Sequence, residues 1–207
     1  MLLAHNGSLV DPLVYCAFEF RLALERLAFE LLAQIRGSKF DTSDLNSSNK
    51  LKNIQNRIYH LEGNQHRLDR KLLFLKILIA QAGYKDFPIA GINLSSLKRH
   101  WEFCSRYCHL QLNLNQTWGD PAFVERCATG LKEIEVFLDP ILANLILWPQ
   151  WTDDPWINGL LTRFVEGNLD DTNLKIELEK RGVWGTMTGW DGKAVFLSDL
   201  YKEHSSG

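Results

Sequence analysis

Residues 97–111, LKRHWEFCSRYCHLQ, bring together side chains that could do acid–base, nucleophilic or metal chemistry. Arginine can hold a phosphate and stabilise developing negative charge, while histidine transfers protons near neutral pH. Arg106 and His109 are therefore candidate catalytic residues for phosphodiester cleavage. The alternative is a solvated polar helix face with an incidental histidine.

A metal site in this segment is disfavoured. His100, Cys104 and Cys108 have i, i+4, i+8 spacing, but zinc prefers four N or S ligands and no second cluster follows. Free cysteine is among the most buried residue types and behaves as a small hydrophobe. We therefore predict core cysteines, no metal and no cofactor.

Placed on a helix over residues 96–112, the segment has two faces about 200° apart, at ~100° per residue. An apolar face would consist of Leu97, Trp101, Cys104, Cys108 and Gln111. A polar face would consist of Arg99, Glu102, Arg106, His109 and Asn113. This pattern predicts that the two cysteines point into a core, while Arg106 and His109 point away from it.

The middle of the chain is basic. Residues 47–112 carry eleven Lys or Arg and four Asp or Glu, a net charge of +7, although the whole chain has −2. This charge suggests a polyanion or an acidic partner, and the alternative is packing against acidic helices of the same fold. The candidate RNA- or partner-binding residues are Arg99, Arg57, His60, Arg67 and Arg70. The net charge of −4 over residues 150–207 disfavours DNA binding by the tail.

Apolar periodicity predicts that four helices position these residues. The first follows Asp11-Pro12 and ends near Gly37, and the second runs for about 30 residues from Leu51 to just before Gly83, unless Gly63 splits it. The third covers 96–112 with a cap at Ser95 or Ser96. The fourth opens at Asp120-Pro121 and is kinked or restarted at Pro140. The fold class is mainly α, a four-helix up-and-down bundle.

The tail differs in composition. Residues 150–207 predict two short helices, the first opened at Asp154-Pro155 and the second capped by Asp170, Asp171 or Thr172. They also predict a β-hairpin with its turn at Asp191-Gly192. We therefore predict two domains, an α-helical bundle over 1–149 and a small C-terminal α+β appendage over 150–207.

The first helix, FEFRLALERLAFELL, followed by a bundle with an internal W…SRYCH helix, resembles HEPN-superfamily proteins. The resemblance covers about residues 10–148. It implies a small α-helical bundle of the kind found in bacterial defence and toxin–antitoxin systems. Many family members are metal-independent ribonucleases that dimerise around an R-x(4–6)-H motif. No Arg–His pair here has that spacing, since Arg106 and His109 have two residues between them.

We therefore expect a non-catalytic RNA- or protein-binding or assembly module, plausible in a defence or toxin–antitoxin system. The alternative is a metal-independent HEPN-type ribonuclease using Arg106 and His109, so whether the protein is an enzyme stays open. The resemblance implies a homodimer or hetero-complex formed through the bundle, with RNA as a further partner. No apolar run approaches the ~18 residues needed to cross a bilayer, and no CxxC pair occurs. We expect a cytoplasmic protein without membrane contact.

Overall fold

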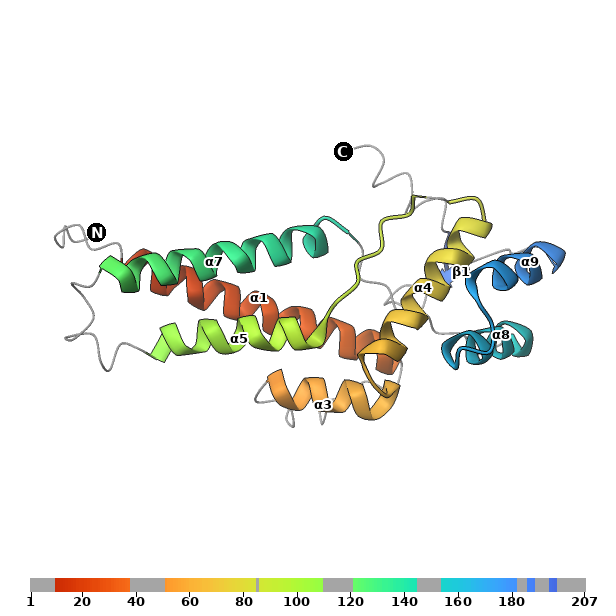
Figure 1. The fold of residues 1–207 in the computed structure, drawn as a ribbon, viewed down its shortest axis with the longest axis horizontal. Helices are drawn as coiled ribbons and strands as arrows, with labels where there is room; N and C mark the ends of the chain where they lie inside the picture. Colours follow the sequence, from red (N-terminus) through yellow and green to blue (C-terminus); the bar gives the residue numbers. More distant parts are fainter. Residues whose placement is uncertain are drawn as a thin grey trace. The chain divides into compact units, whose positions relative to one another are not determined.

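The computed structural model describes residues 10–37, 51–84, 86–109, 121–144, 154–181, 186–188 and 194–196. The described chain is mainly helical, as predicted (Figure 1). It divides into two compact units. Unit 1 comprises Met1–Leu61 and Ile92–Ala143, and unit 2 comprises Glu62–Gly91 and Asn144–Gly207.

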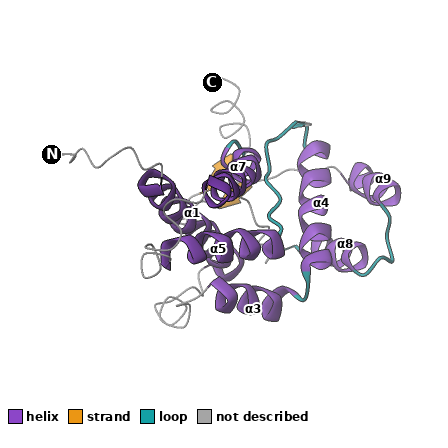
Figure 2. Cartoon of the chain, turned by 60° about the vertical axis from the view of Figure 1, so that its left-hand side comes forward, coloured by secondary structure: helices purple, strands orange, loops and turns teal. Residues whose placement is uncertain are grey.

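Unit 1 is built around α1, Val10–Arg36, which packs against both α5, Leu94–His109, and α7, Pro121–Leu142. Figure 2, turned by 60°, again shows these three helices adjacent, and α3, Leu51–Glu62, lies beside α5 in both views. Their shared core consists of apolar side chains spaced three or four residues apart. Its fully buried members include Leu24, Leu32, Ile54, Ile58, Leu97 and Ile134.

A polar link fixes α5 on α1. The indole Nε1 of Trp101 donates a hydrogen bond to Oε1 of Glu25 at 2.7 Å, and the Arg21 guanidinium lies 5.1 Å from the Trp101 ring centroid. Arg21 also pairs with Glu25 along α1, with 3.3 Å between Nε and Oε1. The Arg21–Glu25 pair, which has i, i+4 spacing on α1, therefore also helps to set the position of α5.

The predicted single helix from Leu51 to Gly83 is wrong, and the split at Gly63 is what the structure has. The chain forms α3 and then α4, Gln65–Gln81, with Gly63 between them at φ 97°. Glycine adopts this left-handed conformation without the cost that a Cβ adds. Asn64 then caps the new helix, because its side-chain oxygen accepts a hydrogen bond from the Arg67 backbone N at 3.0 Å.

Unit 2 packs α4 against α8, Pro155–Val165, and α9, Asp171–Arg181. Asp154 caps α8 through its carboxylate, as the sequence predicts, and Asp170, one of the three candidate caps, does the same for α9. The centre of this core is the Phe74–Phe164 pair, with ring centroids 5.8 Å apart. The buried cluster consists of Phe74, Ile77, Leu78, Leu160, Phe164, Leu169, Leu174 and Leu178.

Two short strands of unit 2 pair antiparallel. Strand β1, Thr186–Thr188, pairs with β2, Ala194–Phe196, with Met187 opposite Val195. The predicted hairpin turn at Asp191-Gly192 lies outside the described residues. The two units divide the chain differently from the predicted domains 1–149 and 150–207. The segment Glu62–Gly91, which contains α4, belongs to unit 2 together with α8 and α9.

Two helix boundaries differ from the predictions. Asn93, rather than Ser95 or Ser96, caps α5, because its Oδ1 accepts a hydrogen bond from the Ser96 backbone N at 2.8 Å. Helix α7 continues through Pro140 and ends two residues later at Leu142. A proline so close to the end costs only one of the last backbone hydrogen bonds.

Candidate functional site

The two predicted faces of α5 are confirmed in part, because Trp101 and Cys108 of the predicted apolar face are only half-buried. Leu97 and Cys104 are fully buried, whereas Arg99 and Arg106 are exposed. The side chain of Arg106 turns along its own helix, where Nε donates to the carbonyl oxygen of Glu102 at 3.4 Å.

His109 is the last residue of α5, and its side chain lies outside the described part of the structure. The structure thus places the candidate catalytic residues Arg106 and His109 one turn apart on one helix.

The other predicted binding residues are divided between the two units. Arg57 and His60 belong to α3 in unit 1, whereas Arg67 and Arg70 belong to α4 in unit 2. The break at Gly63 separates the two pairs. Arg67 and His60 are exposed, and Arg57 is half-buried.

Arg70 has a different role from the binding role predicted for it, because its guanidinium is engaged inside unit 2. Nη2 donates to the carbonyl oxygens of Phe164 at 2.6 Å and Leu169 at 3.2 Å, and Nε donates to Phe164 at 3.2 Å. Its Cζ lies 3.7 Å from the Phe164 ring centroid, and Nη1 lies 3.5 Å from Oδ1 of Asp171. Arg70 thus binds the turn between α8 and α9.

Cys104, Cys108 and Cys127 of unit 1 are poor nucleophiles. Burial raises the pKa of the Cys104 thiol to about 12 and that of Cys127 to about 11, and it also raises the pKa of Cys108. A thiol with a raised pKa carries little thiolate near neutral pH. Among the described residues, no group of three or more His, Cys, Asp or Glu side chains could hold a metal ion.

The seam between α5 and α7 is lined by aromatic rings. Tyr107 lies 5.5 Å from Phe123, and His100 lies 4.8 Å from Phe137, both between ring centroids. The partner number on α7 rises as the number on α5 falls, so the two helices run antiparallel. Between these contacts, Gly130 of α7 lets the ring of Phe103 come close, because a Cβ there would lie 2.0 Å from Phe103 Cζ.

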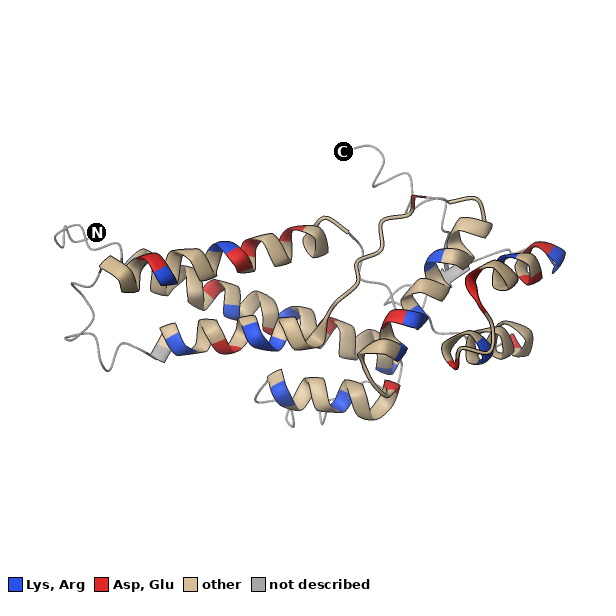
Figure 3. Ribbon diagram, viewed as in Figure 1, with Lys and Arg blue, Asp and Glu red and all other residues tan. Residues whose placement is uncertain are grey.

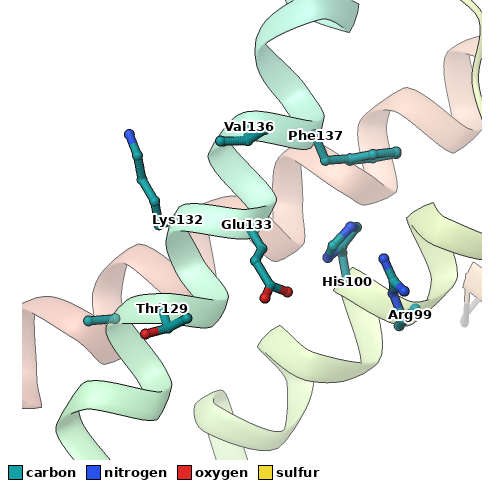
Figure 4. A pocket seen from close by; sticks show the side chains of 8 residues that line it. Arg99, His100, Thr129, Lys132, Glu133, Val136 and Phe137 are labelled. Atoms are coloured by element: carbon teal, nitrogen blue, oxygen red, sulfur yellow. The ribbon is translucent and has the colours of Figure 1, made fainter.

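Beside His100 this seam opens into a groove of about 870 Å³. We call it the α5/α7 groove, and Figure 4 shows its lining from both helices. Glu133 reaches from α7 toward His100, whereas Lys132 points away from α5. The lining residues are Arg99 and His100 from α5 and Ala128, Thr129, Lys132, Glu133, Val136 and Phe137 from α7.

His100 is the buried polar group of this groove, with 5% of its surface exposed. Burial lowers the pKa of its imidazole, the positive charge of Arg99 lowers it further, and Glu133 raises it. His100 is therefore neutral near pH 7 and keeps one ring N–H donor and one acceptor. Its ring nitrogens make no hydrogen bond with another described residue.

Of the groove residues, only Arg99 is predicted from the sequence to bind a ligand, and His100 is a candidate there only as a metal ligand. Glu133, Phe137 and Thr129 were missed because each is an ordinary residue for an amphipathic helix. Their one shared signal is their position beside the apolar stripe of α7, next to Leu131 and Ile134. That position marks a helix–helix seam without showing that the seam opens.

Charge is segregated among the helices of unit 1 (Figure 3). Helix α5 carries three Lys or Arg and one Glu, and α3 carries two and one. Helix α7 carries two Lys or Arg and four Asp or Glu. The net charges are therefore +2 for α5, +1 for α3 and −2 for α7. One basic region of this unit therefore follows α3 and α5, and α7 is acidic.

Comparisons with protein-family models, with curated proteins and with solved structures find no match for this chain. Within the described residues, no helix is both long enough and apolar enough to span a bilayer.

Proposed function

We propose that unit 1 is a HEPN-like four-helix bundle that binds RNA without cleaving it, through the basic helices α3 and α5. The resemblance to HEPN-superfamily proteins and a role in bacterial defence belong to this proposal, as does a C-terminal β-hairpin closed at Asp191-Gly192. The cytoplasm is the proposed location because all four cysteines are free thiols.

The observation that carries this proposal is the exposed pair Arg99 and Arg106. They lie seven residues apart on the same face of α5, about 10 Å along the axis at ~1.5 Å per residue. The Arg99 guanidinium makes no ion pair with another described residue, so it is available for a ligand. Neighbouring α3 adds exposed Lys52 and His60. Guanidinium groups on one face are the usual contacts to a phosphate backbone.

The test is binding of a fluorescently labelled single-stranded 20-mer RNA by anisotropy between 50 and 200 mM salt. The double variant Arg99→Gln/Arg106→Gln should bind more weakly. It should also reduce the slope of log affinity against log salt by about 1.4, because each arginine that binds a phosphate of a single strand contributes ~0.7 to that slope.

A matched control removes the same charge elsewhere. Arg126→Gln/Arg163→Gln replaces exposed arginines of α7 and α8. Loss of affinity in both double variants to the same extent would contradict a site on α5. Intact RNA after incubation in EDTA fits a binding protein. Cleavage by the wild type but not by His109→Ala would instead establish the ribonuclease alternative with Arg106 and His109.

A second candidate function is self-assembly, which an exposed apolar stripe on α1 favours. Tyr15, Phe18 and Leu22 are 64%, 45% and 44% exposed and lie on one helix face by their spacing. The occupant this stripe fits is a second copy of the same helix, running antiparallel. Glu19 and Arg26 flank Leu22 on the same side, so a two-fold axis near Leu22 would place each next to the opposite charge of the other copy.

Light scattering at micromolar concentration tests this candidate. Phe18→Gln should convert a dimer to a monomer, whereas Ile176→Gln, at an exposed apolar position of unit 2, should not. A monomeric wild type would rule out this interface, and RNA binding would be unaffected by that result.

A further inference from the structure

The α5/α7 groove carries two charged side chains that have no partner among the described residues. On the same helices, Lys98 pairs with Glu102, and Lys132 pairs with Glu135. Arg99 and Glu133 make neither an ion pair nor a hydrogen bond with any other described residue. They flank His100, whose ring nitrogens likewise have no described partner. A carboxylate, a guanidinium and a nearly buried imidazole thus face one open space.

The groove also has an apolar side. Phe137 is half-buried with its ring 4.8 Å from His100, and Val136, one residue earlier, is 61% exposed. Ala128 adds a small exposed side chain to the same lining. A flat aromatic ligand would cover these apolar atoms while its edge reached the polar groups. Stacking and apolar burial would both make the binding of such a ring more favourable.

The polar groups of the groove determine which hydrogen-bond donors and acceptors such a ligand should carry along its edge. The Glu133 carboxylate has only acceptor oxygens and can take two neighbouring N–H donors, while neutral His100 can donate one N–H to an acceptor. Among the four RNA bases, guanine has O6 as an acceptor followed by N1–H and N2–H as donors. Adenine, cytosine and uracil each offer no two adjacent N–H donors from different atoms on that edge.

We propose that the α5/α7 groove binds a guanine base, with Glu133 accepting from N1–H and N2–H, His100 donating to O6, and Arg99 pairing with the adjoining phosphate. This inference rests on the proposed RNA-binding function, because exposed Arg99 and Arg106 would lead a strand along α5. A free guanine nucleotide offers the same chemistry. The lowered pKa of His100 supports the assignment, since a neutral ring adds no second positive charge beside Arg99.

The experiment compares three labelled 12-mer RNAs that differ at one central base, guanine, inosine or adenine. Inosine lacks only the N2 amino group. Wild-type protein should bind the guanine RNA about tenfold more tightly than the inosine RNA, because a carboxylate oxygen is otherwise left without its hydrogen bond. Glu133→Gln should reduce this ratio toward one. Glu125→Gln, an exposed position of α7 outside the groove, should keep it while changing the net charge equally.

The same proteins are titrated with guanosine and inosine 5′-monophosphates by calorimetry, which separates the two sources of the base. Binding to every RNA with no guanine preference in the wild type would overturn the groove assignment and leave the RNA-binding function standing. A guanine preference that survives in Glu133→Gln would also overturn it. A protein that binds guanosine monophosphate through Glu133 but no RNA would support the groove and overturn the RNA-binding function. Binding of neither RNA nor nucleotide would overturn both.

Discussion

Arg70 and Arg99 come from the same basic stretch of sequence, yet they have opposite surroundings. In unit 2, Arg70 is half-buried, and its guanidinium donates to the carbonyls of Phe164 and Leu169 and approaches the Asp171 carboxylate. In unit 1, Arg99 is exposed at the edge of a groove and pairs with no other described residue. One arginine holds its own fold together, and the other is available to a ligand.

This contrast shows that a net charge of +7 over residues 47–112 does not describe one surface. Part of the charge satisfies backbone carbonyls at the turn between α8 and α9, where an unpaired carbonyl would be costly. Only the charge that the fold leaves unpaired can contribute strongly to binding. The side chains that can contribute in this way include Arg99 and Glu133, which pair with no other described residue.

The largest effect is expected from Arg70→Ala. The substitution removes the donors to two backbone carbonyls and the guanidinium that lies over the Phe164 ring. We expect a loss of about 3 kcal/mol in the free energy of unfolding of unit 2, because buried acceptors lose charge-assisted hydrogen bonds. Urea unfolding followed by circular dichroism measures this loss.

Arg67→Ala is the matched control for this measurement. Arg67 lies one turn earlier on α4, and its side chain is exposed. The free energy of unfolding should change by about 0.5 kcal/mol or less. Equal losses in the two variants would mean that Arg70 is no more structural than its neighbour, and the contrast with Arg99 would disappear.

A smaller effect is expected where α5 and α7 approach each other. Gly130→Ala would place its Cβ 2.0 Å from the ring of Phe103, so the ring or the helices must move. We expect a loss of about 1–3 kcal/mol in the free energy of unfolding, typical of overpacking. Gly159→Ala in α8 of unit 2 meets no atom within 4 Å and should instead stabilise the protein by about 0.5–1 kcal/mol. Thermal unfolding that shifts in the same direction for both would contradict the close approach.

Local signals in the sequence predicted much of the helical structure. Helix α8 begins after Asp154 as predicted, and α9 begins after Asp170, one of its three candidate caps, because a carboxylate cap depends on neighbouring residues alone. The faces of α5 also follow from periodicity, because burial of Leu97 and Cys104 repeats at the helical period. The preference for core cysteines agrees with the raised pKa of Cys104.

The division into units and the groove did not follow from local signals. A positive φ at Gly63 separates α3 from α4, although only Gln65 breaks the apolar stripe that runs through both helices. The role of Arg70 depends on residues 94 and 99 positions away, which no spacing rule connects. Glu133 and His100 face each other only because α5 and α7 pack antiparallel beside Gly130.

The smallest expected effect is the pH dependence of stability that arises from His100, and it tests the surroundings of Arg99 in the α5/α7 groove. Burial and Arg99 lower the pKa of His100 in the folded chain below its ordinary 6.5. Between these two pKa values the unfolded chain binds the proton and the folded chain does not. Stability is therefore complete above pH 6.5 and falls as the pH drops toward the lowered value. Urea midpoints at pH 7.5 and 5.5 measure this loss, and His100→Gln should reduce it.

Two further variants determine whether the unpaired charges act on His100. Glu133 raises the pKa of His100, so Glu133→Gln should lower that pKa further and enlarge the loss of stability at pH 5.5. Arg99 lowers the pKa, so Arg99→Gln should bring it closer to the ordinary value and reduce the loss. The two substitutions must therefore move the pH dependence in opposite directions. A common direction would mean that neither charge faces the imidazole, and the groove would lack the arrangement that distinguishes Arg99 from Arg70.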